Sequence, residues 1–259
     1  MDLANHILDL FKTMTPVEAF GWLLVQNILQ FLMCVGGGLL LIKFFNDRRI
    51  YSSPDALSKK EINWAICCVF LNTVVAVTGW FLWKEGIIVI KSEIGPSSIV
   101  DFLALLLMMD FLMYVCHRIV HIPGVYEWVH MTHHQYQITR PLSLFVLNPL
   151  EVFGFGFLWL FVLSIYQSSW IAIVFYLLLN ASFGALGHIG VEPFPQNWIK
   201  LPLVGRLTTS TFHAQHHNQV ESNFGFYTDV WDRIFGSMNK SYESVFIRAA
   251  SGKTAEDTN

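Results

Sequence analysis

The chain has 259 residues, of which 54% are hydrophobic and only 14% are charged. A soluble domain usually has about a quarter of its residues charged, so this composition excludes an ordinary soluble protein. The formal net charge of −3 identifies no binding partner, and such a charge does not indicate nucleic-acid binding.

Apolar runs long enough to cross a bilayer follow one another along the chain. A bilayer core requires roughly 20 apolar residues per helix. We expect spans at residues 17–42, 62–83, 97–116, 144–165 and 169–187. Before the first run, Thr15 suits a helix cap, Pro16 the first helical position and Glu18 the third. This run is too long for the apolar part of a cleaved signal peptide, so we expect it to be a membrane span.

Basic residues predict how the chain is oriented. The loop 43–61 holds Lys43, Arg48, Arg49, Lys59 and Lys60, and cytoplasmic loops carry an excess of such residues. With this loop inside, residues 117–141 and 188–259 are also inside and the N-terminus is outside. The predicted fold is therefore all-α: a polytopic membrane bundle of about four to five spans with a cytoplasmic, histidine-rich helical cap.

Three regions are expected along the chain. Residues 1–96 contain the N-terminal transmembrane helices and the basic loop, residues 97–242 carry the candidate functional residues, and residues 243–259 form a polar, disordered tail. Glycines at 36–38 and at 154 and 156 are expected to allow close helix packing or a kink. The four cysteines lie within apolar spans without CxxC spacing, which favours a packing role.

Nine of the ten histidines fall between residues 117 and 217, at metal-ligand spacing. The third span is expected to continue to about His121, where Pro123 marks its end. A helix starting at Pro123 and another starting near Ser210 would then each carry the sequence His-x-x-His-His. On a helix, residues three and four apart share one face. The histidines of these segments are His117 and His121; His130, His133 and His134; His188; and His213, His216 and His217.

A bound metal is the physical explanation we favour for so many imidazoles. Protonated together they would repel one another, and unligated in an apolar site they would leave polar nitrogens unsatisfied. A metal holds imidazole in its neutral form. Eight or nine histidines are too many for one ion and about right for two. HExxH is absent, and imidazole suits iron, copper, nickel and zinc alike, so the spacing predicts two transition metals without choosing among them.

Beyond the histidines, two longer stretches resemble a known family. These are DFLMYVCHRIVH at 110–121 and NFGFYTDVWDRIFGS at 223–237. Together with the order of the histidine motifs, they resemble the fatty acid hydroxylase/sterol desaturase superfamily of membrane di-iron enzymes. The resemblance covers roughly residues 98–238. The first two spans carry no such motif.

This resemblance implies an oxidoreductase. Members bind two iron ions, use O₂ as co-substrate and take electrons from a separate carrier, such as a cytochrome b5-like protein or a ferredoxin. They attack an unactivated C–H bond of a lipid. The implied iron ligands are His117, His121, His130, His133, His134, His188, His213, His216 and His217. Some members have a further histidine four residues after the one matching His188, and here that position is Glu192. Either Glu192 is itself a ligand, or it lies behind the ligands, or the site uses nine histidines alone; we favour the position behind the ligands.

Several other residues are candidates for supporting roles. Asp110 lies inside a span, and an ionisable residue within a membrane span usually has a functional role. It could reach an imidazole on another helix. Asn218 and Asn223 could hold water near the metals, or act in turns or caps. Asp229 and Asp232 are weaker candidates, and Asp232 could bridge to Arg233 or Arg118. Aromatic residues that could line an apolar tunnel, or simply pack, are Phe111, Tyr114, Phe145, Phe153, Trp159 and Phe183.

The leading hypothesis is an O₂-dependent lipid hydroxylase, and a desaturase of the same superfamily is the closest alternative. A metal transporter or metal-binding protein is the alternative from another class, although transporters usually place their ligands near the membrane midplane. A scaffold without activity is a third. The substrate is not identified: fatty acyl chain, sterol and related lipids all remain. The compact length and the lack of a dilysine-type signal favour a bacterial inner membrane over the endoplasmic reticulum.

Overall fold

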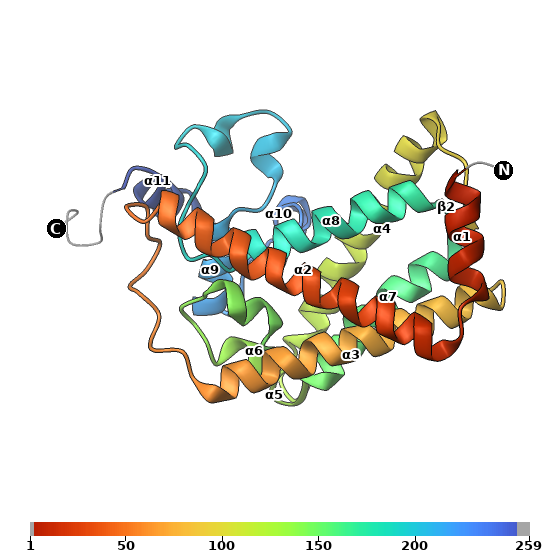
Figure 1. Ribbon diagram of the computed structural model, residues 1–259. Coiled ribbons are helices and arrows are strands. Elements are labelled where there is room, and N and C mark those ends of the chain that lie inside the picture. The colour runs from red at the N-terminus through yellow and green to blue at the C-terminus, as the bar shows by residue number, and fades with distance from the viewer. Residues whose placement is uncertain (1–2, 253–259) are drawn as a thin grey trace.

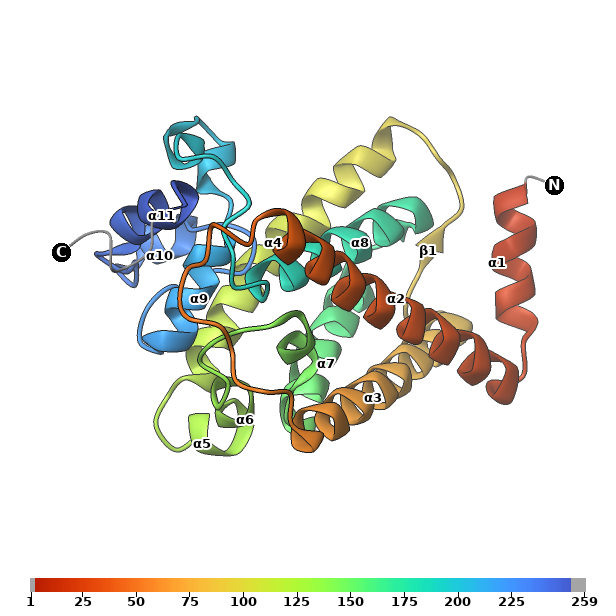
Figure 2. The ribbon, with the colours of Figure 1, turned by 60° about the vertical axis from the view of Figure 1, so that its left-hand side comes forward.

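The structure is a computed structural model that describes residues 3–252. Five apolar helices run side by side and alternate in direction, as Figures 1 and 2 show. They are α2 (Pro16–Phe44), α3 (Lys59–Lys84), α4 (Pro96–Val120), α7 (Pro149–Ile165) and α8 (Trp170–Gly187). In the packing order α2, α3, α7, α4, α8 and back to α2, each helix contacts the next. The bundle is therefore a closed ring of five helices.

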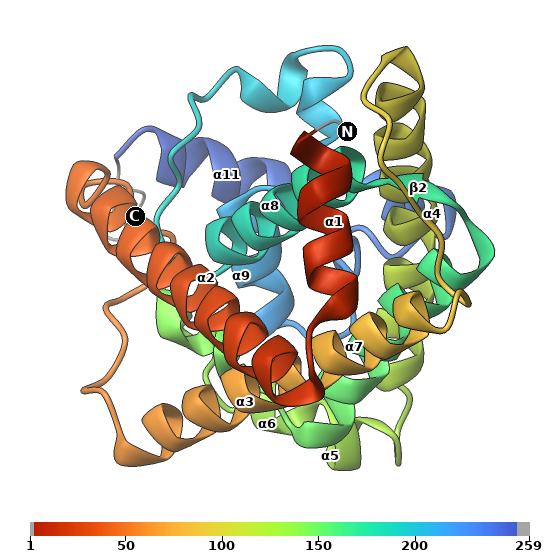
Figure 3. The ribbon, with the colours of Figure 1, turned by 45° about the vertical axis from the view of Figure 1, so that its right-hand side comes forward.

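Short helices gather at one end of this ring and form the cap. They are α5 (Tyr126–Val129), α6 (Met131–His134), α9 (Ser210–Asn218), α10 (Val230–Ile234) and α11 (Tyr242–Ala250), with 3₁₀ turns η1 (Pro141–Phe145), η2 (Trp198–Lys200) and η3 (Val204–Arg206). At the opposite end lie α1 (Leu3–Thr13) and two short parallel strands, β1 (Ile90–Lys91) and β2 (Ser168–Ser169). Figure 3 shows α1 in front of the bundle, and Figure 1 shows it at the end opposite α9 and α11.

Apolar helices lie at all five of the expected positions, although the fourth begins later than expected. Four of them, α2, α3, α4 and α8, are long and apolar enough to cross a bilayer, and α7 is a shorter apolar helix of 17 residues. Their outward faces expose large apolar side chains such as Trp22, Phe70 and Leu107, which is the pattern of helices that face lipid. The chain is therefore an integral membrane protein.

Helix caps determine where two of these helices begin. The capping box predicted before α2 is present: the Thr15 side chain accepts from the Glu18 backbone N–H, and the Glu18 carboxylate accepts from Thr15. The expected start of the fourth span at residue 144 was wrong, because α7 begins at Pro149 after the Asn148 cap. Residues 141–145 instead form the separate turn η1.

Two further expectations about local structure also need correction. The single helix expected from Pro123 is split at His130 (φ −116°) into α5 and α6. The tail expected to be disordered from residue 243 forms α11 up to Ala250, and its Phe246 and Ala249 are fully buried. Phe246 packs in a cluster with Phe212 and Ile199, so burial of an apolar stripe orders this segment. Residues 253–259 of the expected tail lie outside the described residues.

Glycines allow close approach at two of the places expected. A Cβ on Gly38 would lie 2.6 Å from the Pro141 side chain, and a Cβ on Gly156 would lie 2.8 Å from Val75. The first contact brings α2 against η1 and the second brings α7 against α3. At Gly36, Gly37 and Gly154 a Cβ would meet nothing within 4 Å, so the packing role holds for one glycine in each motif.

Candidate metal centre

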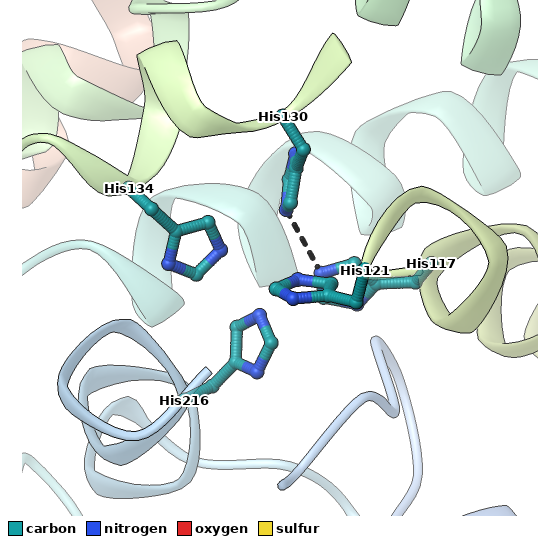
Figure 4. A group of neighbouring side chains, drawn as sticks. All are labelled: His117, His121, His130, His134 and His216. Atoms are coloured by element: carbon teal, nitrogen blue, oxygen red, sulfur yellow. Dashed lines mark hydrogen bonds between the residues drawn. The ribbon is translucent and has the colours of Figure 1, made fainter. Parts of the chain in front are cut away.

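All nine expected histidines converge where the bundle meets the cap. They come from the end of α4, the α5–α6 segment, the end of α8, and α9. Their ring nitrogens form two compact groups, within each of which the ligand atoms all lie within 4.8 Å of one another. The five-histidine group is His117, His121, His130, His134 and His216, drawn in Figure 4, and the four-histidine group is His133, His188, His213 and His217.

The two groups explain why the chain contains His-x-x-His-His twice. In the first copy, His130 and His134 belong to the five-histidine group and His133 to the other. The second copy is assigned in the opposite way: its i, i+4 pair, His213 and His217, joins the four-histidine group, and its middle histidine joins the other. Each motif therefore contributes two ligands to one group and one ligand to its neighbour, which also holds the two groups side by side.

Distances in the four-histidine group fit a single ion. Four nitrogens placed tetrahedrally at about 2.1 Å from one ion lie about 3.4 Å apart. The Nε2 atom of His217 lies 3.1 Å from that of His133 and 3.2 Å from that of His213. The Nε2 atom of His188 lies 3.2 Å from that of His133 and 3.4 Å from that of His213. Four of the six nitrogen–nitrogen distances in this group therefore match those around one tetrahedral ion, and the other two are within 4.8 Å.

The five-histidine group points unpaired nitrogens into one space. Nε2 of His121, Nε2 of His216 and both ring nitrogens of His134 are buried without a hydrogen-bond partner among residues 3–252. The remaining two members approach each other with Nε2 atoms 3.2 Å apart, along the dashed line in Figure 4. Buried polar atoms without partners are costly, and a metal at the centre of the group would satisfy one nitrogen of each of these rings.

Hydrogen bonds on the outer side orient several of these rings. The Nδ1 atom of His117 donates to the Phe224 carbonyl at 2.8 Å, and that of His188 donates to the Gly184 carbonyl at 2.9 Å. The Nδ1 of His216 donates to the Ser222 carbonyl at 2.7 Å. Because a carbonyl only accepts, Nδ1 carries the proton in each ring, and the Nε2 lone pair is directed to the centre.

Glu151 completes this outer layer, and sequence reasoning missed it. Its Oε1 lies 2.7 Å from His130 Nδ1, and both side chains are 3% exposed. Its Oε2 is buried without a hydrogen-bond partner within the described chain. A buried carboxylate needs compensating positive charge, which a metal bound by His130 would supply. The signal that could have found it is its position, since Glu151 is the one charged residue of the run 142–187.

Burial keeps the imidazoles of the cap neutral. It lowers the pKa of His121 to about 2 and the pKa of His188 to about 4. Burial, reinforced by the neighbouring imidazoles, also lowers the pKa of the cap histidines at 130, 133, 134, 213, 216 and 217. Neutral imidazole is the form that binds metal, so these ligands require no deprotonation near pH 7.

Asp110 does not reach an imidazole, contrary to one expectation. Its carboxylate accepts from the backbone N–H of Thr228 at 3.1 Å, from the Thr228 hydroxyl at 2.7 Å and from Trp231 Nε1 at 2.9 Å. Asp110 therefore ties α4 to the segment 223–231.

Asp232 holds the same segment and acts indirectly on a ligand. It accepts from the backbone N–H groups of Phe224 and Gly225 at 2.8 and 2.7 Å, and from the Ser237 hydroxyl. The Phe224 carbonyl is the acceptor for His117. The expected bridge from Asp232 to Arg233 or Arg118 is wrong: Arg233 pairs with Asp229 at 2.8 Å instead.

Glu192 and Asn218 occupy different surroundings. Glu192 is fully buried and accepts from the Thr211 backbone N–H at 3.0 Å and from the Thr211 hydroxyl at 2.6 Å. It therefore anchors the first turn of α9, which carries three histidines. Asn218 is exposed at the end of α9. Asn223, by contrast, is buried and donates to the Phe212 carbonyl at 3.0 Å.

An apolar cavity inside the ring leads away from the histidines. The nearer part, about 210 Å³, is lined by five of the histidines together with side chains such as Leu144 and Phe226. The farther part, about 430 Å³, extends to Phe11, Trp80 and Trp83 at the opposite end. The two parts meet, because they share the lining residues Gln30, Asn72, Met113, Phe145, Phe155 and Asn180.

The aromatic residues expected to line a tunnel divide into two sets. Phe145 lines both parts of the cavity and Trp159 lines the farther part, while Phe183 borders a small void beside His188 and His213. The others pack against neighbouring rings: Phe111 on Trp231, Tyr114 on Phe235, and Phe153 on Phe157.

Known proteins resemble this chain, and the family match covers the region that carries the nine histidines. A family model described as fatty acid hydroxylase matches residues 102–237. A very-long-chain aldehyde decarbonylase of Oryza sativa subsp. indica is 30% identical over 184 residues, covering 68% of this chain and 27% of the relative. A Delta(7)-sterol 5(6)-desaturase of Leptosphaeria maculans is 26% identical, covering 79% of this chain and 56% of the relative. Lathosterol oxidase of Homo sapiens is 24% identical, covering 88% and 76%. No solved structure matches the chain significantly.

Proposed function

Because the chain belongs to the fatty acid hydroxylase family, we propose that it is a membrane di-iron oxidoreductase that hydroxylates a C–H bond of a lipid with O₂. The observation that carries the proposal is the position of two histidine groups at the end of an apolar cavity inside the membrane bundle. Desaturation of a lipid is the second candidate, and it is favoured by the sterol desaturases among the relatives.

In this proposal each histidine group holds one iron. The irons, when bound, supply the redox chemistry that activates O₂ toward an unactivated C–H bond. Neutral imidazoles leave such a centre strongly cationic. In hydroxylation, one oxygen atom enters the C–H bond and the other leaves as water, which consumes two electrons and two protons. In desaturation two hydrogens leave the lipid, and both oxygen atoms become water. An external electron donor is therefore part of the proposal.

The protein's own residues position the reaction. Four histidine rings are held in place before metal binds by hydrogen bonds from their Nδ1 atoms. The acceptors are the carbonyls of Phe224, Ser222 and Gly184 and the carboxylate of Glu151. Such preorganisation reduces the free-energy cost of reaching the reactive arrangement. The cavity wall, built by all five helices, excludes water and holds an apolar body against the histidines. Exposed lysines of the basic loop, Lys43 and Lys59, are candidates for docking an acidic electron donor.

A metal transporter fits the structure less well. The histidines lie at one end of the bundle, and the cavity that continues from them is lined mainly by apolar and aromatic side chains. A path for ions is expected to carry polar or charged groups through the membrane. A lipid substrate fits such a lining.

The test combines metal content with lipid analysis. Wild type, His133→Ala, His134→Ala and the control His6→Ala are expressed in one host, and lipid extracts are compared by mass spectrometry. We expect about two irons in the purified wild type and in His6→Ala, and fewer in the other two. A lipid that gains one oxygen atom only in the strains with wild type and His6→Ala supports hydroxylation. A lipid that loses two hydrogens in the same two strains supports desaturation instead. The proposal would be refuted if both site variants kept the full iron content and gave the same lipid products as wild type.

A further inference from the structure

Carboxamide side chains form a polar belt inside the membrane bundle, where the two parts of the cavity meet. Gln30 comes from α2, Asn72 from α3 and Asn180 from α8, and all three line both parts. Polar side chains within membrane spans are costly and usually serve either helix association or function. Their remaining hydrogen-bonding capacity indicates which role applies here.

Asn180 presents a donor to the cavity. Its Oδ1 accepts from the Tyr227 hydroxyl at 2.6 Å, and the Tyr227 oxygen lies 2.7 Å from the Tyr176 hydroxyl. Since the single Tyr227 proton is used on Asn180, Tyr176 donates to Tyr227. This chain of buried tyrosines holds the Asn180 carboxamide in one orientation. The Asn180 NH₂ group has no hydrogen-bond partner among residues 3–252 and is left at the cavity wall.

Asn72 presents an acceptor from the opposite side of the ring. Its Nδ2 donates to Cys68 Sγ of the same helix at 3.4 Å, so the carboxamide does not join α3 to a neighbouring helix. Its Oδ1 has no partner in the described chain. Gln30 adds a second donor, because its Oε1 already accepts from Gln26 at 2.9 Å, which leaves its NH₂ group.

A hydroxyl group is the chemical group that satisfies this arrangement. A hydroxyl donates one hydrogen bond and accepts up to two, so it can donate to Asn72 Oδ1 and accept one bond from each of the Asn180 and Gln30 NH₂ groups. We propose that Gln30, Asn72 and Asn180 form a subsite for a hydroxyl group, and that the substrate of this chain is a lipid alcohol. This inference rests on the proposed oxidation of a lipid and names the class of that lipid.

The location of the subsite also orients the substrate. The belt borders the small, 210 Å³ part of the cavity that the histidines line, while the larger, apolar part lies on the other side. With its hydroxyl in the belt, a lipid alcohol places its long apolar body in the larger part. The carbon presented to the histidines is then close to the hydroxyl-bearing end of the molecule.

The experiment measures binding rather than turnover. Purified wild-type protein in phosphatidylcholine nanodiscs is titrated with two pairs of radiolabelled probes: cholesterol with cholestane, and hexadecan-1-ol with hexadecane. The two members of each pair share an apolar body and differ chiefly in the hydroxyl. We expect wild type to bind the alcohol of at least one pair about tenfold or more tightly than the hydrocarbon, since a site built for a hydroxyl rejects an analogue without it.

Variants then localise the preference. Asn72→Leu and Asn180→Leu should weaken binding of the alcohol about tenfold and leave the hydrocarbon nearly unchanged. The matched control is Thr78→Val on α3, whose hydroxyl donates to the Val74 carbonyl of its own helix and whose side chain is outside the cavity lining. Circular dichroism and iron content establish that each variant is folded. If a variant fails to fold, the comparison of alcohol and hydrocarbon binding by the wild-type protein still tests whether a hydroxyl subsite exists.

Each outcome separates this inference from the proposed function. Equal binding of alcohol and hydrocarbon in both pairs would overturn the subsite and indicate that water occupies the belt. An equal loss of preference in Thr78→Val would overturn the assignment to these carboxamides. A clear hydroxyl preference without any oxidised lipid in the extracts would leave the subsite standing and refute the oxidase instead.

Discussion

Replacing Glu151 tests whether the histidine groups are built to hold metal. The carboxylate lies 2.7 Å from His130 Nδ1, and at 3% exposure neither side chain is screened by water. Loss of a partner behind a metal-bound histidine typically costs about 10- to 100-fold in metal affinity or activity, which corresponds to about 1.4–2.8 kcal/mol. We expect Glu151→Ala to lie at the upper end of this range, because it removes both the charge and the hydrogen bond.

Glu151→Gln separates these two contributions. Its amide oxygen can still accept from Nδ1, so ring orientation is kept while the charge is lost, and we expect a loss of about tenfold. The matched control is Glu221→Gln, at an exposed glutamate of the cap. The assay is competition between purified protein and a graded chelator, with bound iron read by elemental analysis.

The result that would refute the reasoning is a Glu151→Ala protein that keeps its iron as tightly as wild type. In that case Glu151 would serve only the packing of α7 against the cap. A parallel loss in Glu221→Gln would show that the assay reports general damage.

Two further predictions concern pH and sidedness. Burial lowers the pKa of the cap histidines in the folded protein, to about 4 for His188, so below pH ~6.5 the unfolded chain binds more protons than the folded one. The free energy of unfolding of the chelator-treated protein should therefore be constant above that pH and fall steadily below it. The contribution of His188 alone to this fall is on the order of 3 kcal/mol by pH 4. A melting temperature that does not change between pH 7 and pH 4.5 would contradict this prediction. With the basic loop inside, a tag on the C-terminus should be protected from protease in intact cells and one on the N-terminus should be accessible, and the reverse pattern would overturn the orientation.

The sequence by itself determined the membrane class, the helices and the set of histidines. These features depend on local chemistry: a bilayer requires long apolar helices, Thr15 and Pro16 start one of them, and spacings of three and four residues place histidines on one helical face. The family resemblance followed from the same local patterns, and the match at residues 102–237 confirms it. Spacing also indicated two metals, although it could not say which histidine belongs to which group.

The tertiary structure alone decided how these residues are combined. The division into five and four histidines depends on how α4, α6, α8 and α9 meet, and the partner of His130 is a glutamate on another helix. Asp110 was placed wrongly because its partners, Thr228 and Trp231, lie 118 and 121 residues away. Other rings are oriented by backbone carbonyls, which residue type does not reveal, and the cavity exists only because five helices close into a ring. Such contacts depend on packing between distant segments, whereas spacing reports only a residue's neighbours within one helix.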